Sequence, residues 1–577
     1  MHSIINTFAI KVLINSCIFT IFIISVGKAQ QIRFDNLKEQ YSKDKLLKIN
    51  GGVSANTVFY SGDNSVRDPF TWILSGNVNI SVFNQFNLPF SFNFNNLGGA
   101  YTYPTMPNRL SLHPVYKWVA AHIGDVSMTF SPYTLSGHQF TGAGVDLTPE
   151  HLPLKVSIMY GRLLKATEYN PDERLNMPAY KRMGYGAKVL YDKDKYSLGM
   201  SFFSAKDYEN SLKNLPDSLA VLPQNNVAMS WEAGLRLIKN LTLTVEYGIS
   251  LLTRDMRINN ASSFFDRLFN QNSTSSTYHA LHTDLSYRFM KNTISFGYER
   301  VDPEYQSLGA YYFTNDLENY TVSYARPFFK DKLTFTVNAG LQHDNLDNNK
   351  SEEIQRFVGS ANLNYNHSER LNVSLSYSNF QSYTNIKSQF DYINEITDYD
   401  NLDTLNFTQL SQNATLNINW NIKANETQKH NISFNLNYQE AADKQNDMVR
   451  TGGASQFYNF ATNYGLLFIP QNIQINTSAN VTYNTVGYNN MLTYGPSIGA
   501  ATKLFNNNLT TGITASYNVS TNNGDRQNSI LNLRLNIAYT ILKKHNLNAV
   551  LINQSRKMKE HPKSDDITLT FGYMYNF

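Results

Sequence analysis

The chain has 577 residues, a formal net charge of +4 at pH 7 and one cysteine, and 16% of its residues are charged. No long apolar run follows the N-terminal segment, which excludes a bundle of transmembrane helices. The small positive charge is dispersed, which excludes an extended nucleic-acid-binding surface, so we expect no nucleic-acid partner.

The first 29 residues have the pattern of a secretory signal peptide. Lys11 precedes the apolar run VLINSCIFTIFIISV, and residues 27–29 (Gly-Lys-Ala) give a small-x-small cleavage pattern. Cys17 lies inside the apolar run and not at the cleavage position, which disfavours a lipoprotein. Cleavage after residue 29 would leave no cysteine, so we expect neither a disulfide nor a thiolate metal site. Residues 30–45 would form a short segment before the first strand.

From residue 46 onward, segment after segment alternates between apolar and polar residues. Examples are LTFTVNAGLQ (333–342), LNVSLSYS (371–378), ISFNLNYQ (432–439) and ITLTFGYMYNF (567–577). A period of two predicts β-strands with one apolar and one polar face. A soluble β-sandwich also alternates. These segments often reach about ten residues, however, which is longer than a usual strand and long enough to cross a bilayer at a tilt. We therefore favour a membrane barrel.

The polar face of the predicted strands changes along the chain. It is charged between about residues 153 and 301, whereas from about 333 onward it is mostly Asn, Ser, Thr and Gln, with Arg534 as an exception. In one interpretation, opposite charges pair across neighbouring strands and stiffen the wall. In the other, they form a charged strip that selects solutes or holds a partner or an infolded loop. The predicted charged strip consists of Lys155, Arg182, Lys188, Glu232, Arg236, Glu246, Asp284, Arg288 and Glu299.

The predicted loop 253–275 contains the sequence SSFFDRLF, in which apolar side chains would share one side of a short helix. Such a group needs a surface against which it can be buried. We therefore expect this loop to fold into the lumen as a constriction or to contact a partner. The residues of this predicted contact are Phe264, Phe265, Leu268 and Phe269.

Motifs for catalysis, cofactors and metals are weak. His282 and Asp284 share the inward face of one predicted strand without a third group, so we expect no enzymatic activity, no cofactor and no metal site. The acidic loop 391–403 offers carboxylates that could hold Ca²⁺ but lacks the Gly turn and spacing of an EF-hand, so we favour a solvated loop. Its acidic residues are Asp391, Glu395, Asp398, Asp400 and Asp403.

Tight polar connections alternate with longer ones along the chain. We interpret 124–125, 239–240, 290–292, 330–332 and 543–546 as tight turns. The longer connections are 97–115, 164–178, 206–225, 253–275, 302–315, 344–354, 382–405, 441–453 and 556–565. This layout predicts an all-β fold, a transmembrane antiparallel up-and-down β-barrel over residues 46–577 with about 26 strands (range about 22 to 26). An even count is expected because closure removes every sheet edge from lipid.

The last predicted strand turns Phe571, Tyr573 and Tyr575 to one face and ends on Phe577. This strand resembles the C-terminal assembly signal of Gram-negative outer-membrane β-barrel proteins, the porin-like superfamily. The resemblance implies recognition by the barrel-assembly machinery and residence in outer-membrane lipid. It also implies that the tight turns and residues 30–45 are periplasmic and the long loops extracellular. The motif covers some ten residues and identifies no particular member of the superfamily.

Two classes of function stay open at this point. The first is a pore or transport barrel for polar solutes, with a lumen narrowed by infolded loops. The second is a non-enzymatic barrel subunit of a multi-protein envelope complex (secretion, assembly or conduit sheath) whose lumen or loops hold a partner protein. Residues 30–45 are too few for the plug domain of a TonB-dependent receptor, so a plug would have to come from loops.

Overall fold

The computed structural model describes residues 47–577 except 63–68, 84, 97–108, 172–177, 259–270, 312, 350–354, 381, 385–407, 442–443, 446–447, 450–454 and 487–488. The chain divides into two units, Met1–Lys48 with Ser81–Phe86 and Ile49–Ile80 with Asn87–Phe577. The signal-peptide prediction (1–29) and the segment 30–45 lie outside the described residues. The larger unit contains the fold and the site discussed below.

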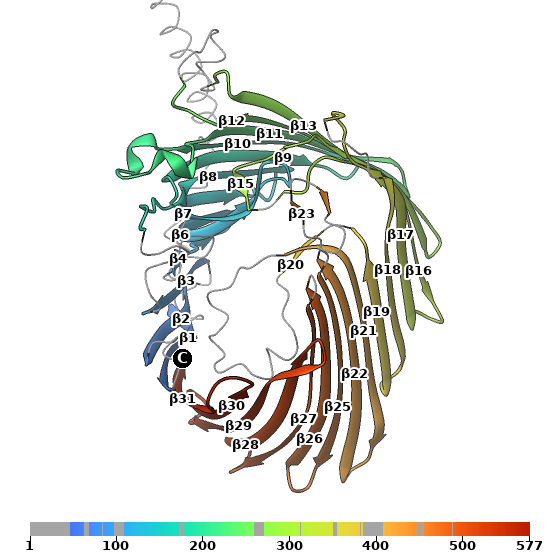
Figure 1. Ribbon diagram of the computed structural model, residues 1–577. Helices are drawn as coiled ribbons and strands as arrows, with labels where there is room; N and C mark the ends of the chain where they lie inside the picture. The colour runs from blue at the N-terminus through green and yellow to red at the C-terminus, as the bar shows by residue number, and fades with distance from the viewer. Residues whose placement is uncertain are drawn as a thin grey trace, which may run out of the picture. The chain divides into compact units, whose positions relative to one another are not determined.

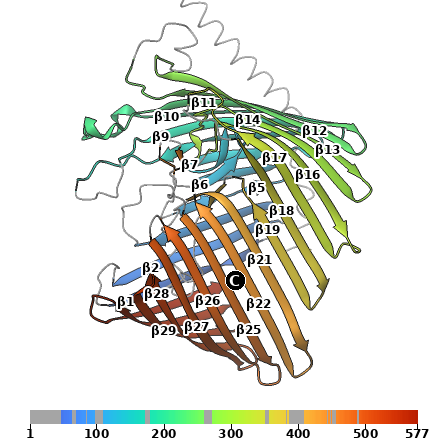
Figure 2. The same ribbon diagram turned by 45° about the vertical axis from the view of Figure 1, so that its right-hand side comes forward.

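The larger unit is a closed antiparallel barrel (Figure 1). β1 (Leu47–Ser61) pairs with β31 (Ser564–Asn576), from Gly52 opposite Asn576 to Ser61 opposite Ile567, so the first and last strands close the ring. The view in Figure 2 shows the long strands running side by side around this ring. The closed antiparallel 26-strand barrel confirms the predicted fold class and strand count.

Most of the barrel strands are long. β3 has 10 residues and β21 has 17, so each can cross a bilayer at a tilt. The strands between β1 and β31 are β2 (Phe70–Val82), β3 (Phe86–Asn95), β4 (Arg109–Leu112), β5 (Val115–Tyr116), β6 (Val119–Thr129), β7 (Leu135–Leu147), β8 (Leu154–Leu164), β9 (Arg182–Asp192), β10 (Tyr196–Asp207), β11 (Asn225–Ile238), β12 (Leu241–Thr253), β13 (Ser275–Phe289), β14 (Asn292–Val301), β15 (Gly309–Ala310), β16 (Leu317–Phe328), β17 (Leu333–His343), β18 (Gln355–Ser368), β19 (Leu371–Ser378), β20 (Ser382–Thr384), β21 (Thr408–Ala424), β22 (Gln428–Ala441), β23 (Lys444–Gln445), β24 (Met448–Val449), β25 (Ser455–Phe468), β26 (Ile473–Val486), β27 (Asn489–Leu504), β28 (Leu509–Asn522), β29 (Asp525–Ile541) and β30 (His545–Met558).

Helical structure is limited to two single turns among the described residues. These are the 3₁₀ helices η2 (Glu209–Ser211) and η3 (Asp217–Leu219). None of the described residues belongs to a helix that is long and apolar enough to cross a membrane.

The outer face of the barrel is apolar and its inner face is polar. In β31, Ile567 and Leu569 are 47% and 40% exposed, whereas Thr568 and Thr570 are 1% and 7% exposed. On the inner face, Ser478 and Ser497 share a hydrogen bond between their Oγ atoms (2.6 Å). Apolar side chains are stable on the outside of a closed barrel where lipid covers them, so this arrangement is typical of a barrel that spans a bilayer.

Two sequence-based predictions are wrong at the start of the barrel. Residues 124–125 are not a turn but lie within β6, where Gly124 has φ +98° and its missing Cβ leaves room for the carbonyl oxygen of Leu110. The Gly-Asp pair therefore marks a close backbone approach inside a strand. In the predicted loop 97–115, residues 109–112 form β4, because Leu110 and Leu112 pair with Phe92 and Phe90 of β3.

Candidate functional site

Two segments of the chain fold onto the inner wall of the barrel. The first luminal segment, 130–134, joins β6 to β7, and the second, 302–316 without 312, joins β14 to β16. Both contact residues of the inward series. Ser250 Oγ donates a hydrogen bond to the carbonyl oxygen of Gln306 (2.6 Å), and Leu308 N donates to Asn226 Oδ1 (3.1 Å). β15, within the second segment, pairs in parallel with the start of β7 and lies inside the ring in Figure 1.

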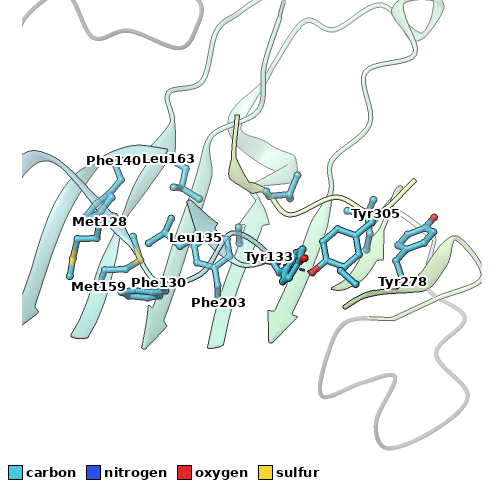
Figure 3. Close-up of a cluster of buried hydrophobic side chains, with 14 of the residues drawn as sticks. Met128, Phe130, Tyr133, Leu135, Phe140, Met159, Leu163, Phe203, Tyr278 and Tyr305 are labelled. Atoms are coloured by element: carbon cyan, nitrogen blue, oxygen red, sulfur yellow. Dashed lines mark hydrogen bonds between the residues drawn. The ribbon is translucent and has the colours of Figure 1, made fainter. Parts of the chain in front are cut away.

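A buried apolar cluster joins the two luminal segments to the wall (Figure 3). The rings of Tyr133 and Tyr305 are 6.0 Å apart at 70°, and the Tyr305 hydroxyl donates to the carbonyl oxygen of Tyr133 (2.9 Å). Burial of apolar area contributes about 25 cal/mol per Å², so this packing holds both segments against the wall. The cluster also contains Val126, Met128, Phe130, Leu135, Phe140, Met159, Leu163, Phe203, Ala205, Leu252, Tyr278, Ala280, Val301, Leu308 and Leu317.

Glycines in the wall make room for the first luminal segment. A Cβ atom at Gly248 of β12 would lie 2.7 Å from Tyr133 Cβ, and one at Gly186 of β9 would lie 2.9 Å from the ring of Phe130. Contacts this short do not occur in folded proteins, so both positions require a residue without a side chain for the segment to lie where it does.

An ion pair connects the second luminal segment to the stem of the loop between β12 and β13. Arg254 Nη2 lies 2.7 Å from Glu304 Oε2, and the Tyr278 hydroxyl donates to the same oxygen (3.1 Å). In this stem, hydrogen bonds from Arg257 lower the pKa of the Asp255 carboxyl. The predicted constriction residues Phe264, Phe265, Leu268 and Phe269 lie outside the described residues, as does the acidic loop 391–403.

The structure places the predicted charged strip in several separate groups. Lys155 Nζ lies 3.3 Å from Asp192 Oδ2, near the turn between β9 and β10. Arg182 Nε lies 2.7 Å from Asp207 Oδ1, at the far ends of β9 and β10. Cross-strand pairing, the first of the two interpretations, describes these pairs.

Arg236, Arg288 and Asp284 of the predicted strip also lie at separate places in the barrel wall. Arg236 Nη1 donates to the carbonyl oxygen of Asp194 in a turn (2.5 Å), and Arg288 lies opposite Thr293 near the turn between β13 and β14. Asp284 lies opposite Gly297, two residues further along β13 than His282.

Four inward residues of the strip region come together in one row. Glu232 lies opposite Glu246, Glu246 opposite His282, and His282 opposite Glu299, on the consecutive strands β11 to β14. Lys188 Nζ lies 2.9 Å from Glu232 Oε1 and offsets the charge of that carboxylate.

The luminal segments and the wall donate hydrogen bonds to this row. Ser131 of the first luminal segment donates to Glu246, and Asn319 Nδ2 donates to Glu299 Oε2 (3.0 Å). The row therefore contacts the first luminal segment directly.

A pocket of about 550 Å³ lies between the two luminal segments and this row. We call it the luminal pocket. Its aromatic residues were not predicted from the sequence, because the pattern of 302–315 is that of an external loop and 130–134 carries no motif. One signal was available, since the inward positions Val126, Met128 and Phe140 are apolar where a solvated lumen would favour polar residues. The pocket is lined by Pro132, Tyr133, Ser136, Glu246, His282, Glu299, Val301, Ala310, Tyr311, Phe313 and Thr314.

The site offers carboxylates, an imidazole and aromatic rings, but within the described part of the chain no three His, Cys, Asp or Glu side chains are arranged to hold a metal ion.

No protein-family model matches the chain, and no curated protein matches it. Solved structures similar to the chain include a point mutant of the ferric enterobactin receptor from Pseudomonas aeruginosa in complex with enterobactin (10% identity, TM-score 0.40, 92% of this chain and 81% of that chain). Others are the ferric citrate transporter FecA in the unliganded form (9%, 0.38, 92% and 79%) and the translocation pore of the P pilus usher PapC (10%, 0.37, 92% and 100%). At these values the similarity carries no argument about function.

Three features define the class of protein to which the chain belongs. These are the pairing of β1 with β31, the apolar outer face and the polar inner face. The chain is a membrane-type β-barrel protein with 26 strands.

Proposed function

We propose that this protein is an outer-membrane pore or transport barrel for polar solutes, with a path narrowed by the two luminal segments. The observation that carries the proposal is the placement of these segments on the inner wall, anchored by a buried apolar cluster and facing a row of charged residues. Barrels of this width are not filled by their own wall side chains, so segments inside them set the size and chemistry of the path.

The polar inner wall further supports transport of polar solutes. The wall beyond β16 carries amides and hydroxyls, such as the hydrogen-bonded pairs Asn435 with Asn417 and Thr493 with Ser520. Neutral hydrogen-bonding groups solvate a polar solute without holding it strongly, which favours passage.

The test is to replace residues 303–315 by a short Gly-Ser linker and to measure single-channel conductance in planar bilayers. We expect a larger conductance than that of the unaltered protein, because the second luminal segment no longer narrows the path. A matched control replaces 559–563, the loop between β30 and β31, in the same way and should leave the conductance unchanged. Heat-modifiable migration in gels reports whether each variant is folded.

The alternative function, a barrel subunit of an envelope complex, makes a different prediction for the same variant. The purified chain would carry no current before or after the replacement, and a protein that co-purifies with the unaltered barrel would be lost. That outcome would contradict the transport proposal.

A further inference from the structure

The described lining of the luminal pocket contains more acidic than basic side chains. Two carboxylates line it, Glu246 and Glu299, and no Lys or Arg is among the described residues of its lining. The hydrogen bonds to them described above come from the neutral side chains of Ser131 and Asn319. Glu232, the third carboxylate of the row, lies outside the lining and has Lys188 as its partner. Two of the three carboxylates of the row therefore face the pocket.

His282 is the one imidazole among the described residues of the lining, and it lies between the two carboxylates in the register. Even when His282 is protonated, its single positive charge offsets only one of the two negative charges. A partly buried carboxylate that is hydrogen-bonded by neutral side chains favours a cation nearby, because Coulomb attraction is stronger where water is partly excluded.

Aromatic rings from both luminal segments form the other side of the pocket. Tyr133 and Phe313 have ring centroids 6.2 Å apart. The ring of Tyr311 stacks on His138 at 4.1 Å, and its oxygen accepts a hydrogen bond from Gln139 N (2.9 Å). These contacts fix the rings in place. Ring faces attract cations, and a fixed ring loses little entropy when a ligand binds.

We propose that the luminal pocket binds an organic cation, with an ammonium or guanidinium group at Glu246 and Glu299 and an apolar body against the rings of Tyr133, Tyr311 and Phe313. The volume of about 550 Å³ suits a small molecule better than a single ion. The absence of a three-ligand arrangement in the described residues also favours an organic cation over a metal ion. This inference rests on the proposed function, for which it names the class of solute.

Calorimetric titration of the full-length protein in mild detergent tests the proposal. The probe is benzylammonium, and the comparison compounds are benzyl alcohol and benzoate, which share its ring but not its charge. We expect benzylammonium to bind at least about tenfold more tightly than either compound, which corresponds to one good charge-assisted contact. Equal binding of benzyl alcohol or tighter binding of benzoate would overturn the proposal.

Three variants locate the binding. The double variant E246Q/E299Q should weaken benzylammonium binding at least about tenfold. D284N removes an inward carboxylate of the same strand as His282 that does not line the pocket, and it should change binding less than about twofold. F313L keeps both carboxylates and an apolar side chain, and it should weaken binding about threefold through loss of the ring face. If E246Q/E299Q fails to fold, F313L and D284N still decide the matter. An equal effect of D284N and F313L would place the cation elsewhere.

Binding and conductance separate the two proposals. If the barrel conducts but binds benzylammonium no better than benzyl alcohol, the proposed transport function stands and the proposed cation site is contradicted. If the barrel binds benzylammonium through Glu246 and Glu299 but never conducts, the proposed cation site stands and the proposed transport function is contradicted.

Discussion

Gly248 shows how a single residue positions the luminal pocket. Its strand, β12, also provides Glu246, two residues away on the same inward face. The missing side chain allows Tyr133 to lie against the wall, and the hydroxyl of Tyr305 would lie 3.0 Å from a Cβ at this position. The identity of residue 248 therefore determines where the ring of Tyr133 and the oxygen of Ser131 stand relative to Glu246.

Replacing Gly248 with Ala should displace the first luminal segment. The added methyl would overlap Tyr133 Cβ at 2.7 Å, and overpacking of this kind costs about 1–3 kcal/mol. We expect a lower midpoint of chemical unfolding in detergent and weaker contacts at the pocket. G465A is the control, because the nearest atom to a Cβ there is the flexible side-chain oxygen of Asn476 at 3.2 Å. An equal loss in both variants would show that the cost belongs to the strands and not to the packing of Tyr133.

The site could be predicted from the sequence only in part, because some of its residues belong to strands and others belong to connections. The alternation of apolar and polar residues along the strands predicts that Glu246 and Glu299 face inward, and in the structure both lie on the inward face. This alternation says nothing about Tyr133 or Tyr311, because they belong to connections, and the direction in which a connection folds depends on long-range contacts. Those contacts involve residues about 170 positions apart, such as Tyr133 and Tyr305.

At the scale of elements, the tight turns carry an unusual feature. Met290 and Leu542 are bulky apolar residues with φ +52°, the left-handed region that favours Gly, Asn and Asp, and they are 96% and 82% exposed. Each of these residues is unfavourable at its position both for its backbone conformation and for its exposed apolar surface.

Replacing Leu542 with Asn should therefore stabilise the barrel. Asn tolerates the left-handed conformation at a lower cost, so we expect a gain of about 0.5–1 kcal/mol, measured as a higher midpoint of unfolding in guanidinium. The matched control is L542A, which removes the apolar side chain but keeps an unfavourable residue in the left-handed region. If L542A gains as much as L542N, the backbone conformation is not the source of the strain.

The sequence is most informative at this scale, because a strand pairs with its chain neighbour and a period of two is a local signal. Strands such as β17 and β22 follow the segments expected from alternation. The wrong strand and turn predictions occur where the same residue type is common in two different local structures. Gly124-Asp125 resembles a turn, but the glycine serves a close approach between β4 and β6. Whether such a glycine forms a turn or a close backbone contact depends on a neighbouring strand, which the local sequence pattern does not identify.

At the scale of the whole molecule, closure depends on β31. This strand pairs with β30 on one side and with β1 on the other, and Phe577 N donates to the carbonyl oxygen of Gly51 (3.1 Å). The ring of Tyr575 lies 5.5 Å from that of Phe577. The last strand thus completes the sheet and presents the aromatic series that resembles an assembly signal.

Deleting Phe577, or adding a charged tail after it, should lower the amount of folded barrel. The resemblance to an assembly signal implies that the barrel-assembly machinery would recognise the altered strand less well, so that unassembled chains would be degraded in the periplasm. The measurement is the fraction of heat-modifiable protein in outer-membrane extracts. A charged insertion in the loop 559–563 is the control, since it adds the same charge away from the terminus. Normal levels after deletion of Phe577 would show that the terminal aromatic residue is dispensable.

The environment on the two sides of the barrel wall gives the last prediction. In β22, Ser433 and Asn437 belong to the polar series, whereas Phe434 and Leu436 belong to the apolar series, and Leu436 continues the exposed apolar face through its partner Phe460. If lipid covers the outer face and water fills the lumen, single cysteines at 433 and 437 should react with a water-soluble thiol reagent in intact membranes. Cysteines at 434 and 436 should be protected, because the reagent does not enter the hydrocarbon region. In detergent-unfolded protein all four should react, which controls for intrinsic reactivity. Reaction at 434 and 436 with protection at 433 and 437 in membranes would mean that the polar face is the covered one, and the barrel would not be a transmembrane pore.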